Sequence, residues 1–157
     1  MADPFTGVKF VFRQQVLVGG GTSQAAPLWA GFAAVINLRS DGEANQPLPP
    51  QAEGFAARDL GLSYSHVPVT LTDLDPEQVR KVRAAIDAAG GPVYVHCAAG
   101  QRAVALSLLA TAAEPGVRGD DLIARAAATG LPITDPSLAE FVRTQAERDR
   151  WELLQAV

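Results

Sequence analysis

The stretch 92–110 constrains the fold of this chain more than any other. Val93, Tyr94 and Val95 carry the β-branched and aromatic side chains typical of a buried strand, and two glycines and a proline precede them. An almost continuous apolar run at 103–110 follows after only a few residues, as a buried central helix requires. The pattern therefore predicts a strand that passes through a short loop directly into a helix.

The chain's single cysteine, Cys97, lies in this loop, and Arg102 stands at the start of the expected helix. A helix N-terminus presents unpaired N–H groups and partial positive charge, which favour a thiolate and hold an anion. The arginine adds a planar donor fork. We predict that Cys97 is a nucleophile, and that an anion contacts the loop at Ala98, Ala99, Gly100, Gln101 and Arg102. The alternative is a buried structural cysteine beside a surface arginine.

Strand and helix patterns alternate along the whole chain. They predict an α/β fold with a central, mainly parallel sheet flanked by helices on both faces, in a single domain, 1–157. Asp75, Pro76 and Gln78 have the residue types of N-cap, N1 and N3, a strong helix start. One or two strands are expected over 8–18, with 16–18 the clearer one, and further strands at 33–38, 64–69 and 93–95. Helices are expected at 24–29, 51–60, 76–89, 102–110, 119–128 and from 136 onward.

The loop His96-Cys97-x-x-Gly100-x-Arg102 resembles the signature of the cysteine-dependent phosphatase superfamily, which is His-Cys-x5-Arg followed by Ser or Thr. Here the arginine comes one residue sooner, and Ala103 stands in place of the hydroxyl residue. The loop is more similar to that of the bacterial beta-lactamase hydrolase-like, tyrosine phosphatase-like family. Other marks of that family occur in order over about residues 15–112: 34–39 (AVINLR), 41–43 (DGE) and 66–69 (HVPV).

This resemblance implies a phosphatase fold and a hydrolase of the protein tyrosine or dual-specificity type. Such an enzyme cleaves phosphate monoesters through a phosphocysteine, here on Cys97, with Arg102 clamping the transition state. It also implies an aspartate that protonates the leaving group from the loop after the preceding strand. Asp73 and Asp75 are the candidates, and Asp73 is preferred because Asp75 already serves as a helix cap.

The sequence allows more than one role for each of three further residues. His96 either orients the cysteine loop from behind or simply ends the strand. Arg39 contacts substrate, braces the cysteine loop, or forms a surface ion pair. Ala103 lacks the hydroxyl that normally helps to expel the thiolate from the phosphocysteine. Its absence predicts slow turnover of the enzyme, or a role for the protein other than phosphate hydrolysis.

The composition of the chain limits the kinds of partner that we expect it to bind. A net charge of −4 without a long basic run argues against nucleic acid or an anionic membrane surface as a partner. Two histidines and one cysteine offer no legible metal cluster, and no cofactor is expected. We see no signal peptide or membrane span, so we expect a cytoplasmic protein. The expected partners are a phosphorylated protein or small molecule, and phosphate or sulfate in the loop.

Two other functions remain open at this point. A rhodanese-like sulfurtransferase would carry a persulfide on Cys97 and bind thiosulfate through Arg102. A non-catalytic phosphate-binding module would keep the loop without a working acid. The sequence does not indicate the substrate or the oligomeric state.

Overall fold

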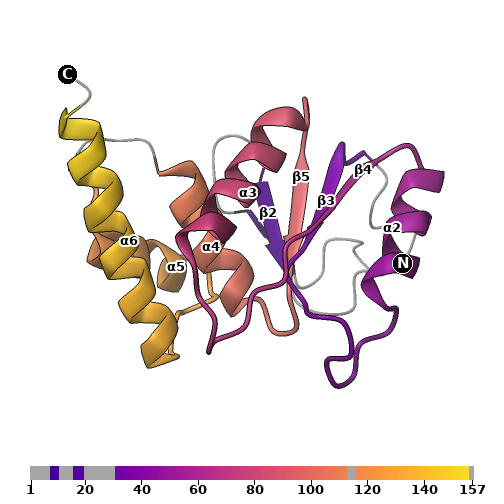
Figure 1. The fold of residues 1–157 in the computed structure, drawn as a ribbon, viewed down its shortest axis with the longest axis horizontal. Helices are drawn as coiled ribbons and strands as arrows, with labels where there is room; N and C mark the ends of the chain where they lie inside the picture. The colour runs from indigo at the N-terminus through magenta and orange to yellow at the C-terminus, as the bar shows by residue number, and fades with distance from the viewer. Residues whose placement is uncertain (1–7, 11–15, 20–30, 113–115, 156–157) are drawn as a thin grey trace.

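A computed structural model describes residues 8–10, 16–19, 31–112 and 116–155 of the chain. Within them five strands form one sheet in the order β1-β2-β5-β3-β4 (Figure 1). The strands are β1 Val8–Phe10, β2 Val16–Gly19, β3 Ala34–Asn37, β4 Ser63–His66 and β5 Val93–His96. β1 is antiparallel to β2, and the other pairs are parallel. The predicted mainly parallel sheet is confirmed.

Helices cover both faces of the sheet, as predicted. α2 (Pro50–Asp59) lies on one side, beside β3 and β4, and the other helices lie together on the opposite side (Figure 1). These are α3 (Pro76–Ala88), α4 (Gln101–Thr111), α5 (Gly119–Ala128) and α6 (Pro136–Gln155).

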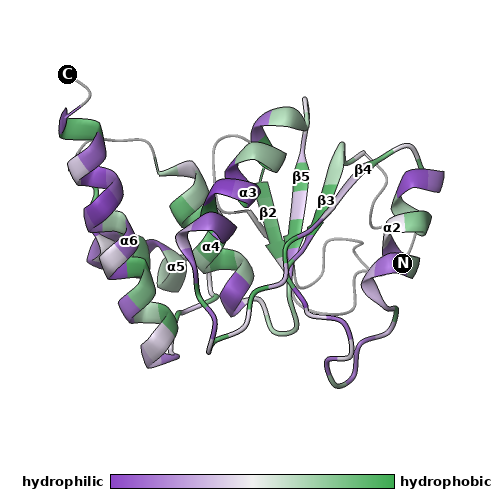
Figure 2. Cartoon of the chain, in the orientation of Figure 1, coloured by the Kyte–Doolittle hydropathy of each residue, from purple (hydrophilic) through white to green (hydrophobic). Residues whose placement is uncertain are grey.

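Alternation along each strand divides the core into two layers. Val93 and Val95 of β5 face the larger cluster, which includes α4, while Tyr94 faces a smaller cluster with Val35 and with Ala57 of α2. Residues 103–110 of α4 are all buried, which explains why this helix is apolar all round (Figure 2). The organising strand and helix therefore run through the centre of the molecule.

The ends of the elements follow their local chemistry. Asp75 caps α3 in the predicted capping box, and its carboxylate accepts the Glu77 N–H at 2.8 Å. The strand expected over 64–69 is shorter, because β4 ends at His66. Val67 N and Val69 N still donate to the carbonyls of Asn37 and Leu38, at 2.9 and 3.0 Å. The helix expected at 24–29 lies outside the described residues.

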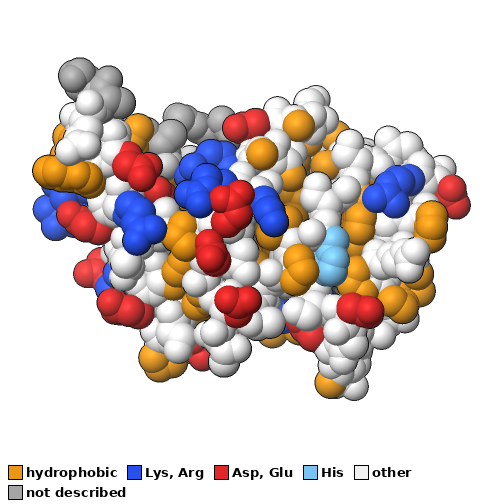
Figure 3. All heavy atoms as spheres, in the orientation of Figure 1, with side chains coloured by type: hydrophobic (Ala, Val, Ile, Leu, Met, Phe, Trp, Pro, Cys, Tyr) orange, Lys and Arg blue, Asp and Glu red, His pale blue; other side chains and the backbone are white. Residues whose placement is uncertain are grey.

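No helix among the described residues is long and apolar enough to cross a membrane. On the face shown in Figure 3, basic and acidic side chains are interspersed.

Candidate functional site

The cysteine loop leaves the sheet at the carboxyl ends of its parallel strands. Gly19, Asn37 and His96 are aligned in register at this edge, so β2 and β3 end on either side of β5. The Leu38 N–H donates to the His96 carbonyl at 2.9 Å and extends the ladder to the start of the loop. Ligands of open α/β sheets collect at this edge.

Two backbone N–H groups point at the Cys97 sulfur. Gly100 N lies 3.1 Å and Ala103 N lies 3.3 Å from Sγ, which has almost no exposed surface. The loop can fold back in this way because Gly100 has φ = 99°, a conformation that favours glycine. A Cβ at Gly100 would also lie 3.1 Å from the Leu131 side chain. The local backbone therefore holds Cys97 where a negative sulfur is stabilised.

Four other N–H groups of the loop have no acceptor in the part of the chain that the structure describes. Among the described residues, no partner accepts from the backbone N–H of Ala98, Ala99, Gln101 or Arg102. The last two belong to the first turn of α4, whose N–H groups have no intrahelical acceptor. Ala98 and Ala99 are exposed. An oxyanion above the sulfur would find donors on the loop and on the helix, and its binding there remains a prediction.

Arg102 points its guanidinium end-on at Glu43. Its Nη1 and Nη2 each lie 2.9 Å from a different carboxylate oxygen, and Nη1 also donates to the Val69 carbonyl at 2.8 Å. The bonds to Glu43 and Val69 leave Nε and the second N–H of Nη2 unused, and Arg102 also has a side-chain hydrogen bond to Cys97. These two N–H groups lie on one side of the guanidinium. They form a second, side-on fork, so Arg102 can hold Glu43 and an oxyanion together.

These contacts shift both groups toward their charged forms. The hydrogen bonds from Arg102 are the largest cause that keeps the pKa of Glu43 below its ordinary value. The same bonds raise the pKa of Arg102, and the nearby charge of Cys97 raises it further. Glu43 therefore remains a carboxylate at neutral pH, where it orients an arginine and has no proton to donate.

Arg39 is buried behind Glu43. Its Nη2 donates to the Ala44 carbonyl at 2.9 Å, and its Nε lies 3.5 Å from Glu43 Oε1. The side chain is 3% exposed, which differs from the surface ion pair that the sequence allowed. Two guanidinium groups thus share one carboxylate, and this trio keeps a net charge of +1 beside the cysteine.

Behind β5, on the α2 side, His96 belongs to a buried polar network. Its Nε2 lies 2.9 Å from Glu53 Oε2, and the Tyr64 hydroxyl donates to the same oxygen at 2.9 Å. Asn37 donates to the Tyr64 oxygen at 3.0 Å and accepts the Arg39 N–H at 2.9 Å. His96 is therefore hydrogen-bonded within a buried network directly behind the cysteine loop.

Gln101 anchors the cysteine loop to the segment before α6. Its Oε1 accepts the N–H groups of Thr134 and Asp135 at 2.9 and 2.7 Å, and its Nε2 lies 3.2 Å from Thr134 Oγ1. Its side chain is thus occupied within the protein. Only its backbone N–H remains for the contact with substrate that the sequence predicts.

The two candidate acids lie in one loop after β4. Asp73 is exposed, and its carboxylate has no partner among the described residues. Its backbone is fixed, because the Gln78 side chain donates to the Asp73 carbonyl at 3.0 Å. Asp75 instead caps α3. Arg102 holds this loop through Val69, so the loop lies next to the cysteine cradle.

Sequence reasoning missed the two glutamates of this region. Glu43 lies in a quoted family mark, but its pairing with Arg102 joins residues far apart in the chain and no local pattern reveals it. Glu53 left a signal, because it lies one turn before Ala57 on the buried face of α2. A carboxylate at a core-facing helix position calls for a buried partner.

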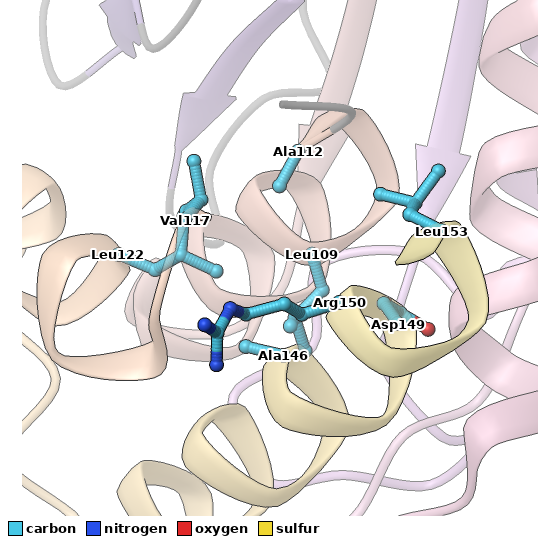
Figure 4. A pocket seen from close by; sticks show the side chains of 8 residues that line it. All are labelled: Leu109, Ala112, Val117, Leu122, Ala146, Asp149, Arg150 and Leu153. Carbon is cyan, nitrogen blue, oxygen red and sulfur yellow. The ribbon is translucent and has the colours of Figure 1, made fainter. Parts of the chain in front are cut away.

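Other places in the described chain do not extend this site. No group of three or more possible metal-ligating side chains is present among those residues. A small cavity lies at the far end of α4 from Cys97, between Leu109, Leu122, Ala146 and Leu153, with Asp149 and Arg150 at its wall (Figure 4). Burial raises the pKa of Asp149.

Solved phosphatase structures share this architecture. Tk-PTP in its active form matches with a TM-score of 0.72 at 19% sequence identity, covering 90% of this chain and 97% of that one. A candidate phosphatase from Neisseria meningitidis matches with a TM-score of 0.70 at 25% identity, covering 88% and 97%. The protein is thus tyrosine phosphatase-like in fold.

The family follows from the sequence match. Residues 15–114 fit the model of the beta-lactamase hydrolase-like protein, phosphatase-like domain, and the chain belongs to this family. The beta-lactamase hydrolase-like protein of Xylella fastidiosa is 38% identical over 104 residues, which cover 66% of this chain and 24% of the relative. The chain spans about a quarter of the length of that relative. The resemblance inferred from the cysteine loop is confirmed.

Proposed function

We propose that this chain is a cysteine-dependent phosphatase that hydrolyses phosphate monoesters through a phosphocysteine on Cys97. The observation that carries the proposal is the position of the sulfur: it accepts the N–H groups of Gly100 and Ala103, and the N–H groups of Ala98, Ala99, Gln101 and Arg102 have no acceptor among the described residues. Such donors stabilise a thiolate and then the charge that develops on a transferring phosphoryl group. The phosphatase-like family and fold support this chemistry.

In the first step the Cys97 thiolate attacks phosphorus, and the bond from phosphorus to the ester oxygen breaks. The side-on fork of Arg102 and the N–H groups of the loop hold the non-bridging oxygens. Asp73 gives its proton to the leaving alkoxide or phenoxide. Glu43 and Arg39 keep the arginine in place, so we assign Arg39 to bracing the site rather than to substrate contact.

In the second step a water molecule attacks phosphorus, and the sulfur–phosphorus bond breaks. The Asp73 carboxylate takes the proton from that water, and the sulfur leaves as a thiolate. Ala103 offers only its backbone N–H to the departing sulfur, at 3.3 Å. We expect this second step to be slow for that reason. The substrate is a phosphorylated protein or small molecule, and these 157 residues act as one phosphatase-like domain.

The test measures nitrophenyl phosphate hydrolysis and thiosulfate:cyanide sulfur transfer on the same preparation, beside a Cys97→Ser variant. We expect slow but measurable hydrolysis that is absent from the variant, and a phosphate adduct on Cys97 by mass spectrometry after an acid quench. Sulfur transfer far faster than hydrolysis would assign a sulfurtransferase. Vanadate binding without either activity would assign a phosphate-binding module.

A further inference from the structure

His66 ends β4 at the edge of the sheet from which the cysteine loop leaves, and the reaction outlined above gives it no part. It begins the stretch 66–69 (HVPV), one of the family marks. It is aligned in register with Asn37, the last residue of β3, so the loops after the two strands begin side by side (Figure 1). The residue is exposed, yet its ring has a partner: Nε2 lies 2.5 Å from the backbone carbonyl oxygen of Arg39.

The acceptor fixes which ring nitrogen carries a proton. A carbonyl oxygen only accepts hydrogen bonds, so the Nε2 of His66 must donate. It donates both in the neutral tautomer with its proton on Nε2 and in the imidazolium, in which both ring nitrogens carry one. The contact therefore needs no particular charge on the ring, and His66 acts in it as a donor with a defined direction.

The peptide that receives this bond is held on its other side by Glu43. The carbonyl of Arg39 and the N–H of Ser40 belong to one planar peptide unit, so they point in opposite directions and turn together. The Ser40 N–H donates to Glu43 Oε2 at 2.7 Å. Rotation of this peptide plane would break both bonds at once. A single peptide unit therefore links the His66 ring to the Glu43 carboxylate.

A tight turn brings the Glu43 side chain back to this peptide. Gly42 has φ = 83°, which favours glycine, and the Glu43 N–H donates to the Ser40 carbonyl at 3.4 Å. The Arg39 side chain closes the turn, because its Nη2 donates to the Ala44 carbonyl at 2.9 Å. These contacts are local, whereas the bond to the Arg39 carbonyl ties the turn to β4.

The carboxylate at the end of this turn holds the arginine of the cysteine loop. Glu43 Oε2, which accepts the Ser40 N–H, also accepts Arg102 Nη1 at 2.9 Å, and Oε1 accepts Nη2 at 2.9 Å. A carboxylate that moved with a rotated peptide would no longer present both oxygens to the guanidinium. The direction of the Arg102 fork thus depends on the peptide that His66 holds.

We infer that His66 is a positioning residue: by holding the peptide between Arg39 and Ser40 it fixes Glu43, and through Glu43 it fixes the direction of Arg102. This rests on the proposed function, in which the side-on fork of Arg102 holds the transferring phosphoryl group.

The first test is NMR of ¹⁵N-labelled protein, which needs no turnover. We expect a proton on the Nε2 of His66, and separate signals for the two Nη groups of Arg102, because the end-on pairing stops rotation of the guanidinium. Arg102→Lys assigns these signals. They should merge in His66→Ala and stay separate in His66→Gln, whose amide donates from a similar place. Ser63→Ala, at an exposed position of β4, is the matched control and should change nothing. Separate Nη signals in His66→Ala overturn the proposal, and so does a His66 Nε2 without a proton.

The second test is steady-state hydrolysis of nitrophenyl phosphate. His66→Ala should lower kcat about fivefold, the size of one ordinary hydrogen bond, and should change KM less. Added to Glu43→Gln, it should cost nothing more, since both substitutions act through one arginine. Losses that add independently overturn the proposal.

His66→Gln separates positioning from proton transfer by the ring. Glutamine donates a hydrogen bond but does not exchange a proton at neutral pH, so this variant should keep the activity of the unaltered protein. Loss of activity in His66→Gln with the Nη signals still separate would assign proton transfer to His66 and overturn the positioning role. The expected Nη signals in a chain without hydrolysis would contradict the proposed function and still support the link from His66 to Arg102.

Discussion

The guanidinium of Arg102 and the carboxylate of Glu43 meet end-on, with 2.9 Å between each nitrogen and its oxygen. This pairing leaves the side-on fork of the arginine unused by Glu43, and Arg102 also has a side-chain hydrogen bond to Cys97. The orientation of Arg102 therefore depends on a residue 59 positions away in the sequence.

Glu43→Gln should lower kcat for nitrophenyl phosphate at least about tenfold, since an amide holds only one N–H of the fork and Arg102 can rotate. KM should change less, because the loop N–H groups remain. The measurement is steady-state hydrolysis at neutral pH. Asp41→Asn is the matched control, an exposed acid in the same loop that should keep full activity. Equal losses in both variants would show that the charge of the loop matters rather than the pairing.

The same pair should make the free energy of unfolding depend on pH. The pKa of Glu43 is lowered in the folded protein from an ordinary value of about 4.5, chiefly by the Arg102 hydrogen bonds. A lowered pKa gives stability that is fully present above 4.5 and is lost as pH falls through the folded value. Urea unfolding of the unaltered protein and Glu43→Gln should thus converge as pH drops from 6 to 3. Asp149, whose pKa is raised, occurs in both proteins and cancels in the difference. A difference that stays constant with pH would contradict this assignment.

Substitutions of Asp73 and of Asp75 should have different effects, the first on activity and the second on stability. Asp73→Asn should slow hydrolysis of alkyl phosphates much more than of nitrophenyl phosphate, because only the poor leaving group needs a proton. Asp75→Ala should instead cost about 1 kcal/mol of stability through loss of the cap. Parallel kinetic and thermal measurements check both. Loss of activity in Asp75→Asn alone would reverse the assignment.

The sequence predicts the elements of the site better than their connections. Cys97, Gly100 and Arg102 could be placed because strand, loop and helix are contiguous and each has local chemistry. The capping box of Asp75 could be predicted for the same reason. The roles of Glu43 and Glu53 could not be predicted, because their partners come from other elements of the fold. The register of β3, β4 and β5 brings each glutamate close to its partners. Arg39 shows the same limit: nothing local distinguishes a buried brace from a surface ion pair.

Ala103→Ser should raise turnover by assisting departure of the thiolate. In the structure the Ala103 side chain is fully buried at the first turn of α4, and its N–H already donates to Cys97 Sγ at 3.3 Å. A serine hydroxyl there adds a second donor near the sulfur that must leave in the second step. The expected gain lies in breakdown of the phosphocysteine rather than in its formation, so kcat should rise while the burst of nitrophenol keeps its rate. Ala103→Val, with a β-branched but apolar side chain, controls for the effect of bulk at this position. Rapid-quench measurement of the adduct separates the two steps. If the burst rate rises and the steady state does not, attack on phosphorus is the step that the hydroxyl assists.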